Sequence, residues 1–169
     1  PNVVMNTYML EACHQAGVKK FAFLRSGAAY PDTGARPVSE PEMFSGEPAD
    51  VYFPVAWMKR YGEILCRTYA EHIDPPMPCV VVRPSNVYGP GDKFDPNTSH
   101  VTASLIRRVA ERETPMEIWG TGNDIRDLIY IDDFIDGLLA AFARPEAYLE
   151  VNICAGTGVS VKQILQTAL

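Results

Sequence analysis

The sequence lacks the features that mark several specialised classes of protein. No apolar run approaches the roughly 20 residues that a membrane-spanning helix needs; stretches such as 79–82 and 129–131 are far shorter. Basic residues are outnumbered, with 15 Lys and Arg against 21 Asp and Glu and a formal net charge of −6. That balance argues against binding to a nucleic-acid backbone. We therefore expect neither a membrane nor a nucleic acid as a partner.

Cysteine is scarce, and its spacing matches no zinc or redox motif. We interpret the four thiols as reduced and buried in a cytoplasmic protein; they are Cys13, Cys66, Cys79 and Cys154. The acidic pair Asp132-Asp133 is typical of a helix start, where carboxylates stabilise the helix dipole, so we expect no metal. The chain opens at Pro1-Asn2 without methionine, and we expect a piece of a longer protein that begins with no signal or transit segment.

What is present is a globular composition in which helical and strand patterns alternate. Periodicity predicts helices over residues 2–16, 55–73, 101–112, 132–143 and 160–169, and strands over 20–26, 79–83, 116–119, 128–131 and 151–154. The strands are continuous apolar runs, which is typical of a parallel sheet buried on both faces. The sequence therefore predicts an α/β fold with a largely parallel sheet.

Turn residues support these boundaries. Gly17 stands where a left-handed helix stop is expected, Pro54 suits the first turn of a helix, and Ser160 suits an N-cap. Residues 30–54 hold five prolines, a density that predicts a long functional loop without regular structure. A second loop is predicted over residues 85–100.

Several motifs, taken in order, resemble the extended short-chain dehydrogenases of the NAD-dependent epimerase/dehydratase family. They are Leu10-Glu11-Ala12-Cys13 at a helix end, Ser26 and Tyr30 after a strand, Lys59 on a helix, the run from Arg83 to Pro90, the run from Arg126 to Asp133, and Val151-Asn152-Ile153. The resemblance spans nearly the whole chain.

The resemblance implies a Rossmann-like, mostly parallel sheet flanked by helices. Residues 1–90 would form the second half of the dinucleotide-binding domain, and residues 91–169 part of a small α+β substrate domain. The strand near 128–131 or that near 151–154 is a candidate to return to the sheet. The glycine-rich turn G-x-x-G-x-x-G, which holds the dinucleotide pyrophosphate in this family, does not occur in the sequence.

The resemblance also implies a catalytic set. In this family a Tyr acts as general acid and base, a Lys four residues later lowers the Tyr pKa and holds the nicotinamide ribose, and a Ser binds the substrate oxygen. Ser26 and Lys59 occupy the matching positions, but Val55 stands where the Tyr is expected. Alternatively, Ser26 only caps a turn and Lys59 is a solvated helix residue.

The missing phenol leaves other tyrosines to consider. Tyr52 is the nearest, seven residues before Lys59. Because Pro54 disfavours helix before it, we predict that Tyr52 folds back to the site as the catalytic phenol, with Tyr30 and Tyr61 as the other candidates. The alternative is that proton transfer through tyrosine has been lost.

The run from Asp92 to Arg108 resembles one branch of the family. In that branch a Cys two residues after the Ser and a later His exchange protons during epimerisation. His100 matches the His, whereas Ala28 stands at the Cys position. A catalytic and substrate-binding role is therefore implied for His100, with a helix cap or a surface position as the alternative, and two-centre epimerisation is in doubt.

Further residues match ligand contacts of the family. Arg108 and Arg126 match arginines that face the diphosphate of a sugar nucleotide, whose oxygens a guanidinium binds in pairs; surface salt bridges are the alternative. Asn86 matches a substrate-contacting amide, and Pro84-Ser85 matches the segment beside the nicotinamide. Trp119 either stacks near the nucleotide or fills core.

Together these features predict an enzyme that takes NAD or NADP and a nucleotide-sugar and transfers hydride at the sugar ring. Helices 2–16 and 55–73 resemble the pair that forms the family dimer, so we expect a homodimer. Two alternatives stay open: a binding protein impaired in catalysis, suggested by Val55 and Ala28, and a fragment inactive on its own. These residues do not decide between NAD and NADP, among nucleotide-sugars, or among epimerisation, dehydration and reduction.

Overall fold

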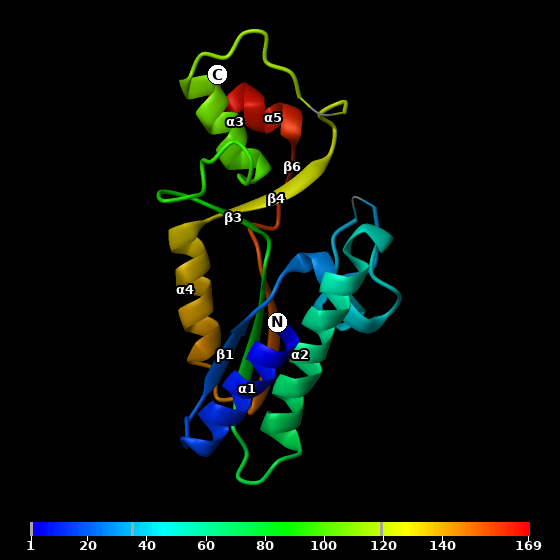
Figure 1. The fold of residues 1–169 in the computed structure, drawn as a ribbon, viewed down its shortest axis with the longest axis vertical. Helices are drawn as coiled ribbons and strands as arrows, with labels where there is room; N and C mark the ends of the chain where they lie inside the picture. The colour runs from blue at the N-terminus through cyan, green and yellow to red at the C-terminus, as the bar shows by residue number, and fades with distance from the viewer. Residues whose placement is uncertain (1, 35, 119) are drawn as a thin grey trace. The chain divides into compact units, whose positions relative to one another are not determined.

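The structure is a computed structural model that describes residues 2–34, 36–118 and 120–169 (Figure 1). The helices are α1 (Asn2–Gln15), α2 (Phe53–Glu71), α3 (Val101–Ala110), α4 (Ile131–Phe142) and α5 (Val161–Ala168). The strands are β1 (Phe21–Leu24), β2 (Cys79–Pro84), β3 (Asn86–Tyr88), β4 (Ile125–Tyr130), β5 (Tyr148–Ile153) and β6 (Gly158–Ser160). The chain forms two compact units: unit 1 holds residues 1–84 and 135–153, and unit 2 holds residues 85–134 and 154–169.

Unit 1 is built on a three-stranded parallel sheet of order β1-β2-β5. Residues 21–24 of β1 lie beside 79–82 of β2, and 79–84 of β2 lie beside 148–153 of β5. Because β2 is central, the four residues from Cys79 to Val82 are fully buried, as their continuous apolar run predicts. The α/β fold with a parallel sheet is therefore confirmed.

Helices cover the sheet of unit 1. Helix α1 packs on α2, and α2 packs on β2 and β5; Leu10, Cys66 and Val81 belong to the core between them. Figure 1 shows α2 and α4 on opposite sides of this sheet. Gly137 of α4 approaches Ile153 of β5 so closely that a Cβ there would lie 3.0 Å from an Ile153 methyl group.

Unit 2 has a smaller sheet in which β3 pairs with β4 in parallel and β4 pairs with β6 antiparallel. Helices α3 and α5 pack together around Leu105, Val161 and Ile164. Ser160 caps α5, since its hydroxyl accepts a hydrogen bond from the Gln163 amide at 3.1 Å, as predicted.

A glycine and a proline mark helix boundaries in unit 1 as predicted. Gly17 has φ +69°, the left-handed conformation that glycine adopts without strain. Pro54 lies in the first turn of α2, where its missing N–H costs no helical hydrogen bond.

Some predictions about the elements are wrong. Residues 116–118 form no strand; Met116 and Ile118 instead pack against the α3–α5 core, which explains their alternating apolar pattern. Trp119 lies outside the described residues. The predicted loop over 30–54 contains two 3-10 helices, Glu40–Phe44 and Asp50–Tyr52.

The short strands β3 and β6 were not predicted, because three residues between turns carry too little pattern. Of the four cysteines predicted to be buried, Cys66 and Cys79 are buried, Cys13 is half-buried and Cys154 is exposed. No helix in the described part of the chain is long and apolar enough to cross a membrane.

Candidate functional site

Ser26 lies at the carboxyl end of β1, the edge of a parallel sheet where ligands bind in open α/β folds. The amide of Arg25 donates to the Val82 carbonyl at 2.7 Å, so the ladder with β2 extends to the residue before Ser26. The half-buried Ser26 then caps a 3-10 helix over Gly27–Ala29, its hydroxyl accepting from the Ala28 amide at 3.3 Å. The cap fixes the position of this hydroxyl at the sheet edge.

Lys59 lies on α2, which packs against the 3-10 helix that Ser26 caps. Its side chain is half-buried, and within the described residues its amine has no hydrogen-bond acceptor or ion-pair partner. Burial lowers the pKa of Lys59, and the positive charge of Arg25 lowers it further. The structure thus brings Lys59 to the segment that carries Ser26.

The tyrosine candidates are placed less favourably. The segment before Pro54 is helical after all, since the 3-10 helix Asp50–Tyr52 leads directly into α2. Tyr52 is therefore the N-cap residue of α2, about 10 Å along the helix axis from Lys59 at 1.5 Å per residue. It is 47% exposed, and no hydrogen bond joins its hydroxyl to Lys59 in the described structure.

The other two phenols are engaged elsewhere. Tyr30 is buried; its hydroxyl donates to Asn152 at 2.7 Å and accepts from Arg83 at 2.9 Å. The Tyr61 hydroxyl shares a hydrogen bond of 3.2 Å with Thr7 of α1. Burial raises the pKa of Tyr30, although the charge of Arg83 opposes this.

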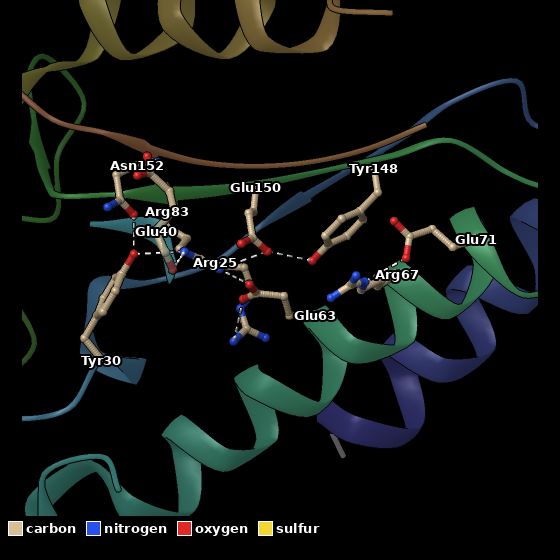
Figure 2. Close-up of polar contacts among 10 residues, drawn as sticks. All are labelled: Arg25, Tyr30, Glu40, Glu63, Arg67, Glu71, Arg83, Tyr148, Glu150 and Asn152. Atoms are coloured by element: carbon tan, nitrogen blue, oxygen red, sulfur yellow. Dashed lines mark hydrogen bonds and ion pairs between the residues drawn. The ribbon is translucent and has the colours of Figure 1, made fainter. Parts of the chain in front are cut away.

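Close to Ser26 and Lys59 lies a buried ion cluster that sequence reasoning missed (Figure 2). Glu63, one turn after Lys59 on α2, is 1% exposed and lies between two fully buried guanidinium groups. Arg25 approaches its carboxylate at 3.5 Å, and Arg83 donates a hydrogen bond to it. A second carboxylate, Glu150 of β5, lies 3.5 Å from Arg83 and is one-third exposed.

Arg25 is the unusual member of the cluster. None of its three guanidinium nitrogens has a hydrogen-bond partner in the described structure, although its guanidinium lies 5.7 Å from the Phe23 ring centroid. Burial lowers the pKa of Arg25 to about 10, against the opposing effect of Glu63, so the group stays charged at neutral pH. Burial also acts to lower the pKa of Arg83, but its bond and charge interaction with Glu63 raise that pKa overall.

Buried arginines also anchor the long segment 30–54 to unit 1. Arg83 donates to the Glu40 carbonyl at 2.9 Å, and the Asn152 amide donates to the Glu40 carboxylate at 2.9 Å. Arg60 donates to the carbonyls of Ala29 at 3.0 Å and Gly46 at 2.7 Å. The sequence hints at these buried arginines through Arg25 and Arg83, which stand at or next to the ends of the apolar runs 20–26 and 79–83.

Unit 2 carries the residues predicted to contact substrate, each in its own local setting. Asn86 is exposed and its amide donates to the Asp127 carbonyl at 3.0 Å. His100 is exposed at the N-cap position of α3, without a capping hydrogen bond from its side chain. The hydroxyl of Ser85 is buried and has no hydrogen-bond partner in the described chain.

The two candidate arginines differ in their partners. Arg108 makes a two-point ion pair with Glu113, at 2.7 and 2.5 Å, as the salt-bridge alternative proposed. Arg126 of β4 donates to the Ile125 carbonyl at 2.9 Å and has no carboxylate partner among the described residues. Arg126 is therefore the more available of the two for an anionic ligand.

Two further features of unit 2 lie near the predicted substrate loop. The Asp127 carboxylate accepts from the amides of Ala155 at 2.9 Å and Gly156 at 2.8 Å, which fixes the turn after β5. A cavity of about 180 Å³ is lined by residues 87–92 and Ile131. Within residues 2–34, 36–118 and 120–169, no group of three or more His, Cys, Asp and Glu is placed to hold a metal ion.

Each unit presents by itself a polar group that a ligand would satisfy. In unit 1 the Lys59 amine has no acceptor among the described residues, and in unit 2 the buried Ser85 hydroxyl has no partner in the described chain. Each group, taken separately, fits a contact to the nicotinamide end of a dinucleotide. Pro84, the last residue of β2, ends the strand at the edge where such a ligand lies in α/β sheets. The fit concerns this end alone, because the sequence contains no glycine-rich pyrophosphate turn.

The parallel sheet with functional groups at its carboxyl edge defines a Rossmann-like α/β protein, and comparison with known proteins gives the family. The chain belongs to the NAD dependent epimerase/dehydratase family, whose model matches residues 1–154. The chain is 32% identical over 169 residues to a GDP-L-fucose synthase of Sinorhizobium fredii, covering 96% of this chain and 52% of that protein.

Solved structures agree with this assignment. A GDP-L-fucose synthetase from Naegleria fowleri bound to NADP is 27% identical with a TM-score of 0.86, over 99% of this chain and 54% of that one. A UDP-glucose 4-epimerase from Thermotoga maritima with UDP-glucose is 27% identical with a TM-score of 0.83, over 99% and 52%. The chain thus spans about half the length of the relatives it matches.

Proposed function

We propose that the protein carrying this chain is an NAD(P)-dependent nucleotide-sugar oxidoreductase of the epimerase/dehydratase type. The observation that carries the proposal is the placement of Ser26 and Lys59: a capped hydroxyl at the carboxyl edge of β1 and an unpartnered amine on the helix packed against it. Similarity to a GDP-L-fucose synthetase with NADP and to a UDP-glucose 4-epimerase supports both ligand classes.

The bound cofactor supplies the hydride acceptor or donor. Ser26 hydrogen-bonds the reacting oxygen of the sugar, and Lys59 binds the nicotinamide ribose and places a positive charge near that oxygen. Pro84 and Ser85 lie beside the nicotinamide. A proton donor must complete the site, and the candidates in unit 1 are Tyr52 and Lys59 itself.

The substrate is bound by unit 2. Arg126, free of any carboxylate among the described residues, binds the diphosphate, with Arg108 released from Glu113 as a second contact. Asn86 and His100 contact the sugar from exposed positions. Trp119 is proposed to stack on the nucleotide, from its place in the sequence alone.

We also propose a homodimer through α1 and α2. The two helices expose large apolar side chains to solvent: Met5, Tyr8 and Met9 on α1, and Trp57, Tyr61 and Ile64 on α2. Such a face is typical of a surface that a partner covers. A second copy of the chain is the partner we expect.

Val55 favours a second candidate function, a protein that binds the same ligands without turning them over. The two are separated by titrating the full-length protein with NADH and NADPH in a calorimeter, and then measuring cofactor oxidation with keto-sugars linked to GDP or UDP. Binding with turnover supports the oxidoreductase, and binding without turnover supports the second candidate. The absence of both would refute the proposed function.

A further inference from the structure

The side chain of Lys59 is placed to do more than hold a ligand. Its amine is half-buried and unpartnered within the described structure, on the face of α2 that packs toward the end of β1. Residues one turn further along this face, Gly62 and Glu63, are buried, and a Cβ on Gly62 would lie 3.5 Å from the Arg25 guanidinium. Lys59 therefore stands at the solvent side of a buried seam between α2 and β1.

Negative charge near that seam is concentrated around Arg83, which pairs with both Glu63 and Glu150, whereas Arg25 pairs with Glu63 alone among the described residues. Arg25 and Arg83, both fully buried, share the single buried carboxylate of Glu63, as Figure 2 shows. Arg83 donates a hydrogen bond to Glu63, whereas the Arg25 side chain donates none in the described structure. The charge of Arg25 is thus only partly compensated, and it acts on the nearby Lys59 amine.

A buried cation beside an amine makes the ammonium a better acid. Burial and Arg25 both lower the pKa of Lys59. Lysine responds to its surroundings in this way more readily than arginine, which stays protonated. A general acid works best when its pKa approaches the working pH, so the environment of Lys59 favours proton donation.

The three tyrosines considered as donors are less well placed in the described structure than Lys59. Val55 occupies the position one turn before Lys59 on the same helix face. Tyr30 and Tyr61 are engaged in hydrogen bonds to other side chains, and Tyr52 lies about 10 Å along the axis of α2 from Lys59.

We propose that Lys59 itself donates and recovers the proton at the substrate oxygen, and that Arg25 is the positioning residue that prepares its amine. This inference rests on the proposed function. As the sugar carbonyl carbon gains hydride from the reduced nicotinamide, the C=O π bond breaks and the oxygen takes a proton from the Lys59 ammonium. The sugar is reduced, the nicotinamide is oxidised, and the neutral amine is reprotonated by water.

The first test measures the protonation of the Lys59 amine and does not depend on catalytic turnover. The rate at which an amine-selective acylating reagent modifies Lys59 is measured against pH in the full-length protein, with peptide mapping to resolve individual lysines. We expect Lys59 to react at lower pH in the parent than in Arg25→Met, while the exposed Lys162 of unit 2 reacts alike in both proteins. An unchanged Lys59 profile in Arg25→Met would overturn the role of Arg25.

The charged groups of the cluster beside Lys59 come from four elements: Arg25 at the end of β1, Glu63 on α2 itself, Arg83 on β2 and Glu150 on β5. Because the ammonium is the donor, kcat for reduction should fall on the alkaline side as Lys59 loses its proton. Arg25→Met should move that alkaline limb to higher pH. A limb that stays in place would contradict the proposal, since a purely structural effect of Arg25 lowers kcat at every pH.

The second test replaces the donor. Lys59→Arg keeps the positive charge but cannot release a proton at working pH, so we expect kcat to fall at least about 100-fold in the parent. In a Val55→Tyr background the new phenol can donate, and the same change should cost no more than about tenfold. Tyr52→Phe removes the competing phenol, and we expect it to lower kcat by much less than Lys59→Arg does.

The outcomes are distinguishable. Equal losses from Lys59→Arg in both backgrounds, or a loss in Tyr52→Phe as large as that in Lys59→Arg, would overturn the inference while leaving the oxidoreductase in place. A parent protein that binds and oxidises no reduced cofactor would refute the proposed function, and the proton transfer with it.

Discussion

At the scale of single residues, the balance of buried charge depends chiefly on Glu63, whose carboxylate is shared by Arg25 and Arg83. A buried carboxylate is tolerated when it is paired, and removing the shared partner leaves uncompensated charge in the core. The three residues are therefore not equivalent. Arg83 also donates to the Tyr30 hydroxyl and the Glu40 carbonyl, whereas the side chain of Arg25 makes no hydrogen bond in the described structure.

We expect Glu63→Gln to lower the free energy of unfolding by about 3–5 kcal/mol, because two buried guanidinium groups lose their counter-charge. Arg25→Met should change it by no more than about 1 kcal/mol, since it leaves a balanced Glu63–Arg83 pair and replaces a charge by an apolar chain. Urea unfolding followed by circular dichroism measures both. Similar losses in the two variants would show that Arg25 is a structural partner of Glu63 after all.

The residues of this cluster could not be predicted from the sequence. Arg25 and Arg83 end apolar strand runs and Glu63 lies in a helical pattern, which are ordinary positions for solvated charges. These three side chains are buried because β1 pairs with β2 and because α2 packs with Glu63 directed toward the arginines of these two strands. Ser26 and Lys59 could be identified because they match a motif.

At the scale of elements, the segment 30–54 is tied down by local contacts as well as by arginines. Glu42 accepts from the Ser39 amide at 2.7 Å and pairs with Arg36. The bond from Arg36 and the bonds from Ser39 lower the pKa of Glu42 to about 2. Since the folded-state pKa lies below its ordinary value of 4.5, the charged carboxylate stabilises this turn above pH 4.5.

That stabilisation should be lost as the pH falls from about 4.5 toward 2. We expect protection of the Ser39 amide against hydrogen exchange to decrease over this range in the parent. In Glu42→Gln the protection should be weaker at neutral pH and nearly independent of pH. Equal protection in parent and variant would contradict the role of the carboxylate.

The exposed apolar faces of α1 and α2 give a second prediction at this scale. Tyr8 is 70% and Ile64 54% exposed, and we propose that the dimer covers both. Tyr8→Glu combined with Ile64→Glu should convert the dimer to a monomer in light scattering coupled to size exclusion. The control is Ile106→Glu on α3, where Ile106 is 42% exposed. A parent that is monomeric at micromolar concentration would refute the interface.

Elements with a long pattern were predictable, and short ones were not. The strand over 79–83 and the helix over 55–73 follow from burial and periodicity, and they are present with ends shifted by a few residues. The strands β3 and β6, three residues each, are defined by pairing with β4 rather than by their own composition. Residues 116–118 have an apolar pattern that predicts a strand, but they form none; Met116 and Ile118 pack against the core between α3 and α5 instead.

At the scale of the whole molecule, we propose that unit 1 binds the cofactor and that unit 2 binds the substrate. In unit 1, Lys59 lies on α2, which packs against the 3-10 helix that Ser26 caps, and unit 2 carries Asn86, His100 and Arg126. The assignment of one ligand to each unit is our proposal, based on the family and on the residues that each unit presents.

The most direct test of the central claim is the rate of NADPH or NADH oxidation with a nucleotide-linked keto-sugar, measured for the full-length parent and Ser26→Ala. The account predicts a kcat lower by about 100-fold in Ser26→Ala, with the cofactor Kd unchanged and with Ser45→Ala, an exposed serine of the same unit, like the parent. Equal rates in Ser26→Ala and the parent would contradict it.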